Sequence, residues 1–193
     1  VTADVHKRVM DEVIYPTVRG MASEGNVYTG FLYAGLMIDK AGKPKVIEFN
    51  CRFGDPETQP IMVRLESSLV LLVEAALAKA LDKVEATWDP RPTVGVVLAA
   101  GGYPADYAKG DVIEGLDAAA ELDGKVFHAG TALNAAGEVV TAGGRVLCAT
   151  AIGRTVEEAQ QQAYRLAEKV RWNGRFYRND IGYRAIARER GEA

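Results

Sequence analysis

The stretch from Phe31 to Asn50 constrains the fold more than any other part of the sequence. An apolar run at residues 31–38 is followed by the polar turn D-K-A-G-K-P at residues 39–44, and then by K-V-I-E-F-N. Two apolar segments around a glycine-containing polar turn predict a β-hairpin. The second strand of this hairpin is expected to end at Asn50, immediately before a loop rich in polar residues.

Helices are predicted on both sides of the hairpin. Thr2 or Asp4 can cap a helix whose apolar residues fall on one face, and Pro16 is expected to kink or restart it. After the polar loop, Ser67 or Ser68 can cap a second, strongly apolar helix. The apolar residues of that helix are expected to form one broad buried stripe, made of Leu69, Leu72, Val73, Ala76, Leu77 and Leu81.

The second half of the chain reads as short strands followed by a helix. The rigid connector W-D-P-R-P at residues 88–92 precedes an apolar strand at residues 93–100. Further strands are expected around residues 125–128, 138–141 and 145–152, and a capping box (Thr155 and Glu158) opens a helix. This pattern predicts the α+β class, with an antiparallel sheet and helices in residues 1–90 and a small α/β domain in residues 91–193.

Composition excludes several classes of protein. Hydrophobic residues make up 48% of the 193 residues and charged residues 25%, which is typical of globular proteins. The net charge of −3 gives no general attraction to nucleic acid, and no apolar run approaches the roughly 20 residues that span a membrane. The two cysteines lie far apart without metal-ligand spacing, which indicates a reducing cytoplasm.

The end of the predicted hairpin carries the first candidate site. Glu48 and Asn50 are two residues apart on a strand, so both side chains project from one face, whereas Phe49 is expected to point into the core. A carboxylate beside an amide oxygen suits Mg²⁺, which takes its other ligands from water and substrate phosphates. Taken alone, this pair indicates a polar strand edge more often than a metal site.

The loop after Asn50 strengthens the interpretation as a binding site. Arg52 offers a planar fork of donors to a carboxylate or phosphate, and Gly54 and Pro56 shape a tight bend. Asp55, Glu57 and Thr58 add polar groups to the same loop, in a position that commonly binds substrates. A surface turn held by internal hydrogen bonds is the alternative.

One further arginine is a candidate for substrate binding. Arg145 follows two consecutive glycines, an arrangement that permits an anion to approach closely. An ordinary surface arginine is the alternative at this position.

The loop and its surroundings resemble one family. V-I-E-F-N-C-R-F-G-D-P-E-T-Q is similar to the characteristic loop of phosphoribosylamine–glycine ligases, which belong to the ATP-grasp superfamily. Other blocks match in the family's order over nearly the whole chain: Y-T-G-F-L-Y-A-G-L-M, A-A-G-G-Y-P, F-H-A-G-T, G-G-R-V-L and F-Y-R-N-D-I-G-Y-R-A. An isolated E-x-N-x-R would indicate the superfamily only, so the ordered blocks are what favour this particular family.

The resemblance implies an ATP-dependent ligase of purine biosynthesis. It would join glycine to 5-phosphoribosylamine through a glycyl phosphate and release ADP, phosphate and glycinamide ribonucleotide. Glu48 and Asn50 would bind Mg²⁺ or Mn²⁺, and Arg52 would stabilise the acyl phosphate and the transition state. Gly54, Asp55, Pro56, Glu57, Thr58 and Arg145 would contribute to substrate binding.

The resemblance also implies that part of the enzyme lies outside this sequence. The family's amino-terminal portion, with its nucleotide-binding elements, is expected to precede Val1, so this chain alone is expected to be inactive and that portion is its expected partner.

One feature departs from the wider superfamily, in which a further metal-binding carboxylate often precedes the E-x-N strand. Here the preceding strand, F-L-Y-A-G-L-M-I, has no acidic residue, which leaves the number of metals open. Two other interpretations are a different ATP-grasp ligase or carboxylase, and a non-catalytic binding module that keeps the fold.

Overall fold

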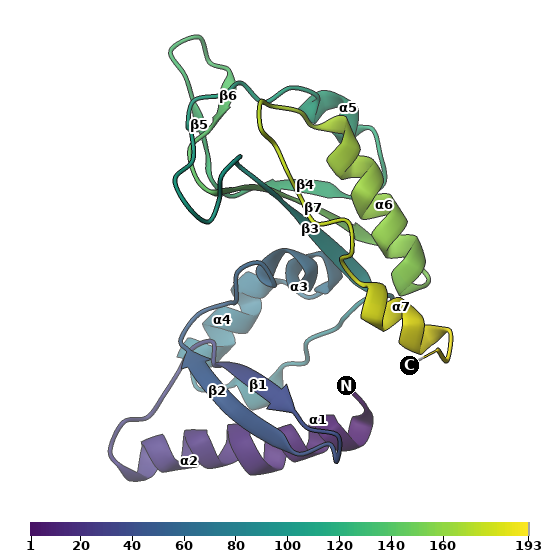
Figure 1. Ribbon diagram of the computed structural model, residues 1–193. Helices are drawn as coiled ribbons and strands as arrows, with labels where there is room; N and C mark the ends of the chain where they lie inside the picture. The colour runs from purple at the N-terminus through teal and green to yellow at the C-terminus, as the bar shows by residue number, and fades with distance from the viewer. Residues whose placement is uncertain (193) are drawn as a thin grey trace. The chain divides into compact units, whose positions relative to one another are not determined.

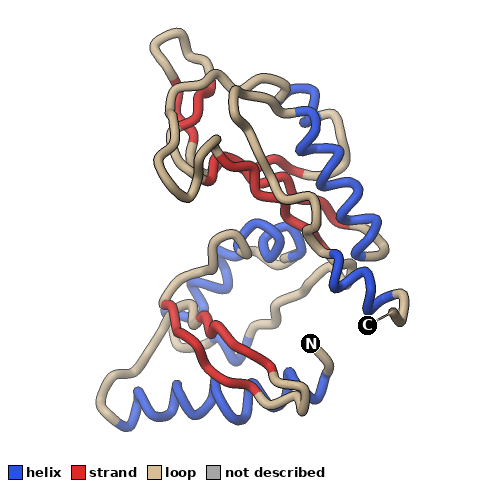
Figure 2. The backbone as a smooth tube through the Cα atoms, in the orientation of Figure 1, coloured by secondary structure: helices blue, strands red, loops and turns tan. Residues whose placement is uncertain are grey.

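A computed structural model of the chain describes residues 1–192, which fall into two compact units. The first unit contains residues 1–55 and 67–86, and the second contains residues 56–66 together with the chain from residue 87 onward. Helices and antiparallel strands occur in both units, as Figure 1 and Figure 2 show, and the predicted α+β class is confirmed. The predicted domain boundary between residues 90 and 91 stays a prediction.

The first unit consists of one hairpin with helices before and after it. Thr2 caps the first helix through its side-chain oxygen, which accepts a hydrogen bond from the backbone N–H of Val5 at 3.3 Å. Pro16 is the second residue of the helix Tyr15–Ser23, which follows directly on a π-helical turn at residues 10–14 in which the N–H of Tyr15 donates to the carbonyl of Met10. The elements are α1 (Ala3–Val9), the π-helical turn η1 (Met10–Ile14), α2 (Tyr15–Ser23), β1 (Tyr33–Ile38), β2 (Pro44–Asn50), α4 (Leu69–Leu77) and the 3₁₀ turn η2 (Leu81–Lys83).

The predicted hairpin is confirmed. Strands β1 and β2 pair in an antiparallel manner, with Tyr33 opposite Asn50 and Gly35 opposite Glu48. The Asp39 carboxylate closes the turn by accepting hydrogen bonds from the backbone N–H groups of Ala41 and Lys43, both at 2.9 Å. These bonds, together with the positive charges of Lys45 and Lys43, lower the pKa of Asp39. The turn therefore fixes the register that carries Glu48 and Asn50 to the end of β2.

The predicted burial of apolar residues in the first unit is wrong. Phe49 was expected to point into the core, but it is 42% exposed. The apolar stripe expected on α4 is not buried either, because no residue of that helix is buried and Leu77 is 73% exposed. The helix itself forms, with the Ser68 hydroxyl accepting a hydrogen bond from the backbone N–H of Leu71.

The second unit is built around a three-stranded antiparallel sheet in the order β3-β7-β4. The strands predicted around residues 93–100, 125–128, 138–141 and 145–152 are confirmed, whereas helix α3 and strand β5, which pairs with β6, were not predicted. The elements are α3 (Thr58–Arg64), β3 (Thr93–Ala99), α5 (Leu116–Ala120), β4 (Lys125–His128), β5 (Thr131–Leu133), β6 (Val139–Thr141), β7 (Arg145–Ile152), α6 (Val156–Lys169) and α7 (Tyr183–Glu189).

Helices cover both faces of this sheet. Helix α6 packs along β3 and β7, as Figure 1 shows, and buries Ala163 and Leu166 completely against strand residues such as Leu98. Helix α3 packs on the same two strands, where Pro60 lies against Gly95. The predicted cap of α6 is half confirmed. The Thr155 hydroxyl accepts from the N–H of Glu158 at 3.1 Å, but the Glu158 carboxylate accepts from the N–H of Arg154 instead of that of Thr155.

The connector at residues 88–92 is fixed within the second unit. The N–H of Asp89 donates to the carbonyl of Arg64 at 2.8 Å, and the Arg64 side chain donates to the carbonyl of Asp89 at 2.9 Å. The Asp89 carboxylate in turn pairs with Arg91, with 2.6 Å between Oδ2 and Nη2. None of the described helices has both the length and the apolar character needed to cross a membrane.

Candidate functional site

The end of β2 places the predicted metal pair on one face of the hairpin. Glu48 and Asn50 alternate with Phe49 along the strand, so their side chains leave the same face. Glu48 is exposed and Asn50 is half-buried. A carboxylate and an amide thus lie on one side of the strand, as a ligand pair for a hydrated cation requires.

Gly35 makes room for the Glu48 side chain. It lies opposite Glu48 in β1, and a Cβ atom at this position would approach Glu48 Cγ to 2.9 Å and Oε1 to 3.6 Å. The carboxylate chain thus lies across β1 in space that any other residue would occupy. This role was not predicted, although a glycine within the apolar strand F-L-Y-A-G-L-M-I often indicates the close approach of another group.

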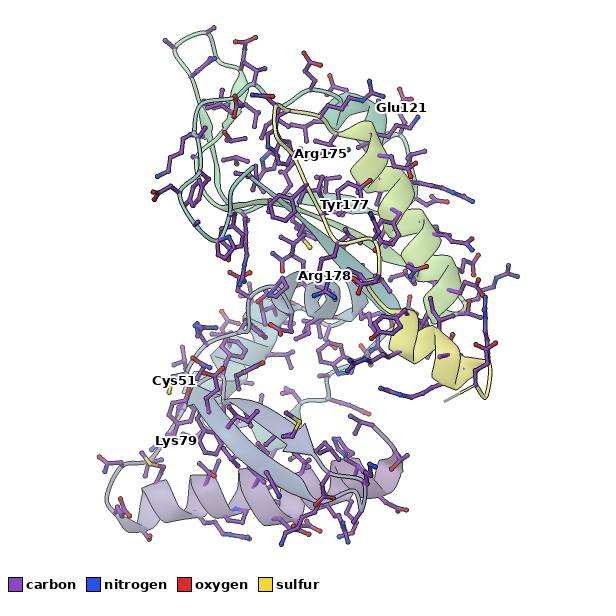
Figure 3. All side chains as sticks on the ribbon, in the orientation of Figure 1. Cys51, Lys79, Glu121, Arg175, Tyr177 and Arg178 are labelled. Carbon is purple, nitrogen blue, oxygen red and sulfur yellow. The ribbon has the colours of Figure 1, made fainter. Side chains whose placement is uncertain are left out.

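Arg52 follows the strand by two residues, and Cys51, labelled in Figure 3, lies between it and Asn50. The Arg52 side chain is exposed, and its Nη1 donates to the carbonyl of Phe53 at 2.8 Å. The Phe53 ring packs on Phe31, with 4.1 Å between ring centroids. The start of the loop is therefore anchored to the segment that leads into β1, which keeps the arginine near the end of the hairpin.

The rest of the predicted substrate loop divides between the two units. Gly54 is buried and Asp55 is exposed at the end of the first unit, while Pro56, Glu57 and Thr58 open the second unit. The loop was expected to extend to Pro60, but α3 already begins at Thr58, with Glu57 as its N-cap residue. The helix takes in Pro60 because a proline is tolerated in the first turn, where its N–H would have no helical partner.

The residues at the hairpin end fit a divalent cation that takes few protein ligands. Among residues 1–192, no three His, Cys, Asp or Glu side chains gather as a metal cluster. The donors in this region are one carboxylate and one amide oxygen, and Mg²⁺ is commonly held by one or two carboxylates plus waters and substrate phosphates. A strongly hydrated cation of this kind suits Glu48 and Asn50.

Arg145 belongs to a second group of polar residues, in the second unit. It is the first residue of β7, and its Nε donates to the Tyr103 hydroxyl at 3.0 Å. The Tyr107 ring lies 6.1 Å from that of Tyr103, and Lys109 Nζ lies 5.8 Å from the Tyr107 ring centroid. Two basic side chains and two tyrosines thus form one cluster, which we call the tyrosine–arginine cluster (Tyr103, Tyr107, Lys109 and Arg145).

Three of the sequence blocks that are far apart in the chain meet at this cluster. The N–H of Ala100 donates to the carbonyl of Gly144 at 2.9 Å, which joins A-A-G-G-Y-P to G-G-R-V-L. The N–H groups of Ala142 and Gly143 donate to the carbonyl of Gly130 at 2.7 and 3.0 Å, which brings in F-H-A-G-T. The glycines permit these close backbone approaches, so their role is to let the blocks touch.

Two family models match the chain. The phosphoribosylglycinamide synthetase ATP-grasp (A) domain matches residues 1–58, and the phosphoribosylglycinamide synthetase C domain matches residues 93–184. The first match includes Glu48, Asn50 and Arg52, and the second includes Arg145. The two matches together leave residues 59–92 between them.

Curated relatives extend the similarity over the whole chain. It is 88% identical over 193 residues to the phosphoribosylamine–glycine ligase of Pseudomonas aeruginosa, covering 100% of this chain and 45% of the relative. It is 69% identical over 192 residues to the enzyme of the same name from Vibrio cholerae, covering 100% of this chain and 44% of that relative. The chain therefore spans less than half the length of these relatives.

Solved structures agree with these relatives. The crystal structure of a phosphoribosylamine–glycine ligase from Thermotoga maritima superposes with a TM-score of 0.79 at 39% identity, covering 93% of this chain and 44% of that one. N5-carboxyaminoimidazole ribonucleotide synthetase from the same organism superposes with a TM-score of 0.55 at 19% identity, a likeness of fold alone. The predicted resemblance is thus confirmed, and the chain belongs to the phosphoribosylglycinamide synthetase family.

Proposed function

We propose that this chain provides part of the active site of an ATP-dependent carbon–nitrogen ligase that joins glycine to 5-phosphoribosylamine. The observation that carries the proposal is the arrangement of Glu48 and Asn50 on one strand face with Arg52 directly after them. The name and the 88% identity of the Pseudomonas aeruginosa relative support the choice of substrates. The products would be glycinamide ribonucleotide, ADP and phosphate, in the purine pathway and in the cytoplasm.

The reaction would proceed in two steps. A carboxylate oxygen of glycine attacks the γ-phosphorus of ATP, the bond from that phosphorus to the β,γ-bridging oxygen breaks, and ADP leaves. The amine of phosphoribosylamine then attacks the carbonyl carbon of the glycyl phosphate. The amide bond forms, the C–O bond to phosphate breaks, and the amine loses a proton.

The residues at the hairpin end would act through charge and position. Glu48 and Asn50 would hold Mg²⁺ or Mn²⁺, which when bound neutralises the phosphate oxygens of ATP. The Arg52 guanidinium would offer a planar pair of donors to the charge that develops on the transferred phosphoryl group. Its exposed side chain and its bond to the Phe53 carbonyl support this assignment.

The remaining assigned residues would bind the substrates. The Gly54 to Thr58 segment, including Asp55, Pro56 and Glu57, would shape the glycine and phosphoribosylamine pocket. Arg145 would bind an anionic group of the substrate, for which the nearby Lys109 provides additional positive charge. We further propose residues 1–90 as part of the ATP-grasp domain and residues 91–193 as the small domain that follows it.

A chimeric enzyme tests this function directly. In the Pseudomonas aeruginosa relative, the matching segment is replaced by these 193 residues, and ADP release is measured with ATP and Mg²⁺. We expect release only when glycine and freshly generated phosphoribosylamine are both supplied, with glycinamide ribonucleotide formed in equal amount. The 193-residue chain alone, as the control, is expected to release none.

ADP release by the chimera that does not respond to glycine would contradict the proposed substrates. It would favour a different ATP-grasp ligase or carboxylase. A chimera that folds and binds ATP but releases no ADP under any combination of substrates would favour a non-catalytic binding module.

A further inference from the structure

We propose that Tyr103 is a positioning residue, which holds the Arg145 guanidinium in the orientation that receives a phosphate group of the substrate. This inference rests on the proposed function, because it takes Arg145 as the residue that binds a substrate anion. Tyr103 itself has no assigned role in that function. The two residues are 42 positions apart, and the bond from Arg145 Nε to the Tyr103 hydroxyl joins them at 3.0 Å.

The Tyr103 ring is held by the backbone next to Arg145. A Cβ atom on Gly144 would come within 2.2 Å of Cδ2 and 2.7 Å of Cε2 of this ring, so the ring lies directly on the glycine. On its own segment, Gly102 has a φ of +96°, and a Cβ there would approach the carbonyl oxygen of Asp106 to 2.3 Å. Both glycines are therefore required for the ring to reach this position.

The Tyr103 hydroxyl restricts the orientation of the Arg145 side chain. An arginine that is ordered only on binding loses about 2 kcal/mol of rotamer freedom, which weakens its contact with a ligand. A hydrogen bond from Nε fixes the plane of the guanidinium, and the orientation of that plane decides whether two parallel bonds to a phosphate can form. The Arg145 Cζ atom also lies 6.0 Å from the Tyr103 ring centroid, so the ring and the hydroxyl restrain the same group.

The rest of the cluster favours an anionic ligand of the phosphate class. Tyr107 packs edge-on against Tyr103 and also lies on Gly144, with Cε1 at 3.0 Å from the Cβ position. Lys109 Nζ lies 5.8 Å from the centroid of the Tyr107 ring and adds a second cation to the cluster.

Tyr183 in α7 provides a matched control for a binding experiment with the 193-residue chain, because its hydroxyl also accepts a hydrogen bond from an arginine Nε, that of Arg184 at 2.9 Å, outside the cluster. Ribose 5-phosphate is titrated at constant ionic strength, and the Nε–Hε signals of the arginines are followed by ¹⁵N NMR. We expect Arg145→Gln to lose binding, and Tyr103→Phe to weaken it about tenfold, as expected for one hydrogen bond to a charged group. Tyr183→Phe should leave the affinity unchanged. The Arg145 Nε–Hε signal should also move in Tyr103→Phe without ligand.

A double-mutant comparison separates positioning from a general structural role. Lysine has no Nε–H fork for Tyr103 to orient, so Tyr103→Phe should cause no further loss of affinity in an Arg145→Lys background. An equal loss in both backgrounds would mean that Tyr103 acts through the fold, and would overturn the positioning role.

The other outcomes distinguish this inference from the proposed function. If Arg145→Gln loses binding while Tyr103→Phe binds as the unmodified chain does, the positioning role is wrong and the assignment of Arg145 stands. If the unmodified chain does not bind ribose 5-phosphate, or Arg145→Gln binds it equally well, the assignment of Arg145 and the role of Tyr103 both fail.

Discussion

The two units of this chain differ in how much of their apolar surface they bury. In the second unit, Leu98, Leu147 and Leu166 are completely buried in one continuous core beneath α6. In the first unit, Val13 is the one buried apolar residue of the core among those that the structure describes. Both faces of its hairpin are exposed, with Ile47 at 65% on one and Val46 at 44% on the other.

The two groups of proposed functional residues therefore lie on parts of the chain that differ in how much apolar surface is buried around them. Arg145 begins a strand that is buried on both sides of its sheet, and its partner Tyr103 lies on a close backbone contact. Glu48 and Asn50 lie on a two-stranded hairpin, which by itself has marginal stability in water. We therefore expect the geometry of the tyrosine–arginine cluster to depend mainly on this chain's own core.

Two matched leucine substitutions test this difference in burial, and one of them should have the largest effect on stability. Leu166→Ala in α6 removes a fully buried side chain and should lower the free energy of unfolding by about 2–5 kcal/mol. Leu77→Ala in α4 removes a side chain that is 73% exposed, and should change it by about 0.5 kcal/mol or less. Urea denaturation of both variants measures the difference. A cost of Leu77→Ala equal to that of Leu166→Ala would show that the two units bury their apolar residues alike.

A smaller effect on stability is expected at Asp89, in the connector at residues 88–92. Hydrogen bonds from the Arg91 side chain and backbone lower the pKa of Asp89 from 3.8 to about 2. Because the pKa is lower in the folded chain, the stabilisation is complete above pH 3.8 and is lost as the pH falls toward 2. Asp89→Asn should therefore be less stable than the unmodified chain above pH 3.8.

The difference in the free energy of unfolding between Asp89→Asn and the unmodified chain should shrink as the pH falls. Denaturation at several pH values would measure it. Asp180→Asn offers a control, because Asp180 pairs with Arg178 in the same i, i+2 arrangement at 2.7 Å but is exposed. We expect a smaller destabilisation from that substitution, since exposed ion pairs contribute little. A constant difference between Asp89→Asn and the unmodified chain at all pH values would contradict the role of the carboxylate.

The local structure could be predicted where neighbouring residues determine it. The hairpin follows from its polar turn, and the caps at Ser68 and Thr155 from side chains that bond N–H groups three residues ahead. Strand β7 was predicted with its observed bounds. The order of the strands in the sheet was not predicted, since it depends on contacts between distant segments.

Burial was predicted wrongly in the first unit. The apolar pattern of α4 and the alternation around Phe49 indicate which face of an element is apolar, but not which element covers it. For Leu166, β3 and β7 provide that cover within the chain. Leu77 stays 73% exposed and Phe49 42% exposed, so the described residues provide only part of that cover, and this is the physical reason for the two wrong predictions.

Part of the candidate site could also be found in the sequence. The alternation along β2 was enough to place Glu48 and Asn50 on one face. The contact of Gly35 with Glu48 and the bond between Tyr103 and Arg145 were not predictable from spacing, because each joins residues from different strands or loops. The role of Arg145 and of the Gly54–Thr58 segment stays a prediction.

The central claim is that the hairpin of the first unit carries the metal ligands of a ligase. It is tested most directly by Glu48→Gln in the chimeric enzyme, with Glu24→Gln, an exposed substitution at the end of α2, as the matched control. We expect Glu48→Gln to reduce ADP formation by about a hundredfold or more, as the loss of a group that stabilises charge in the transition state does. Glu24→Gln should retain full activity. If Glu48→Gln turned over as the unmodified chimera does at the same Mg²⁺ concentration, the metal assignment would be wrong.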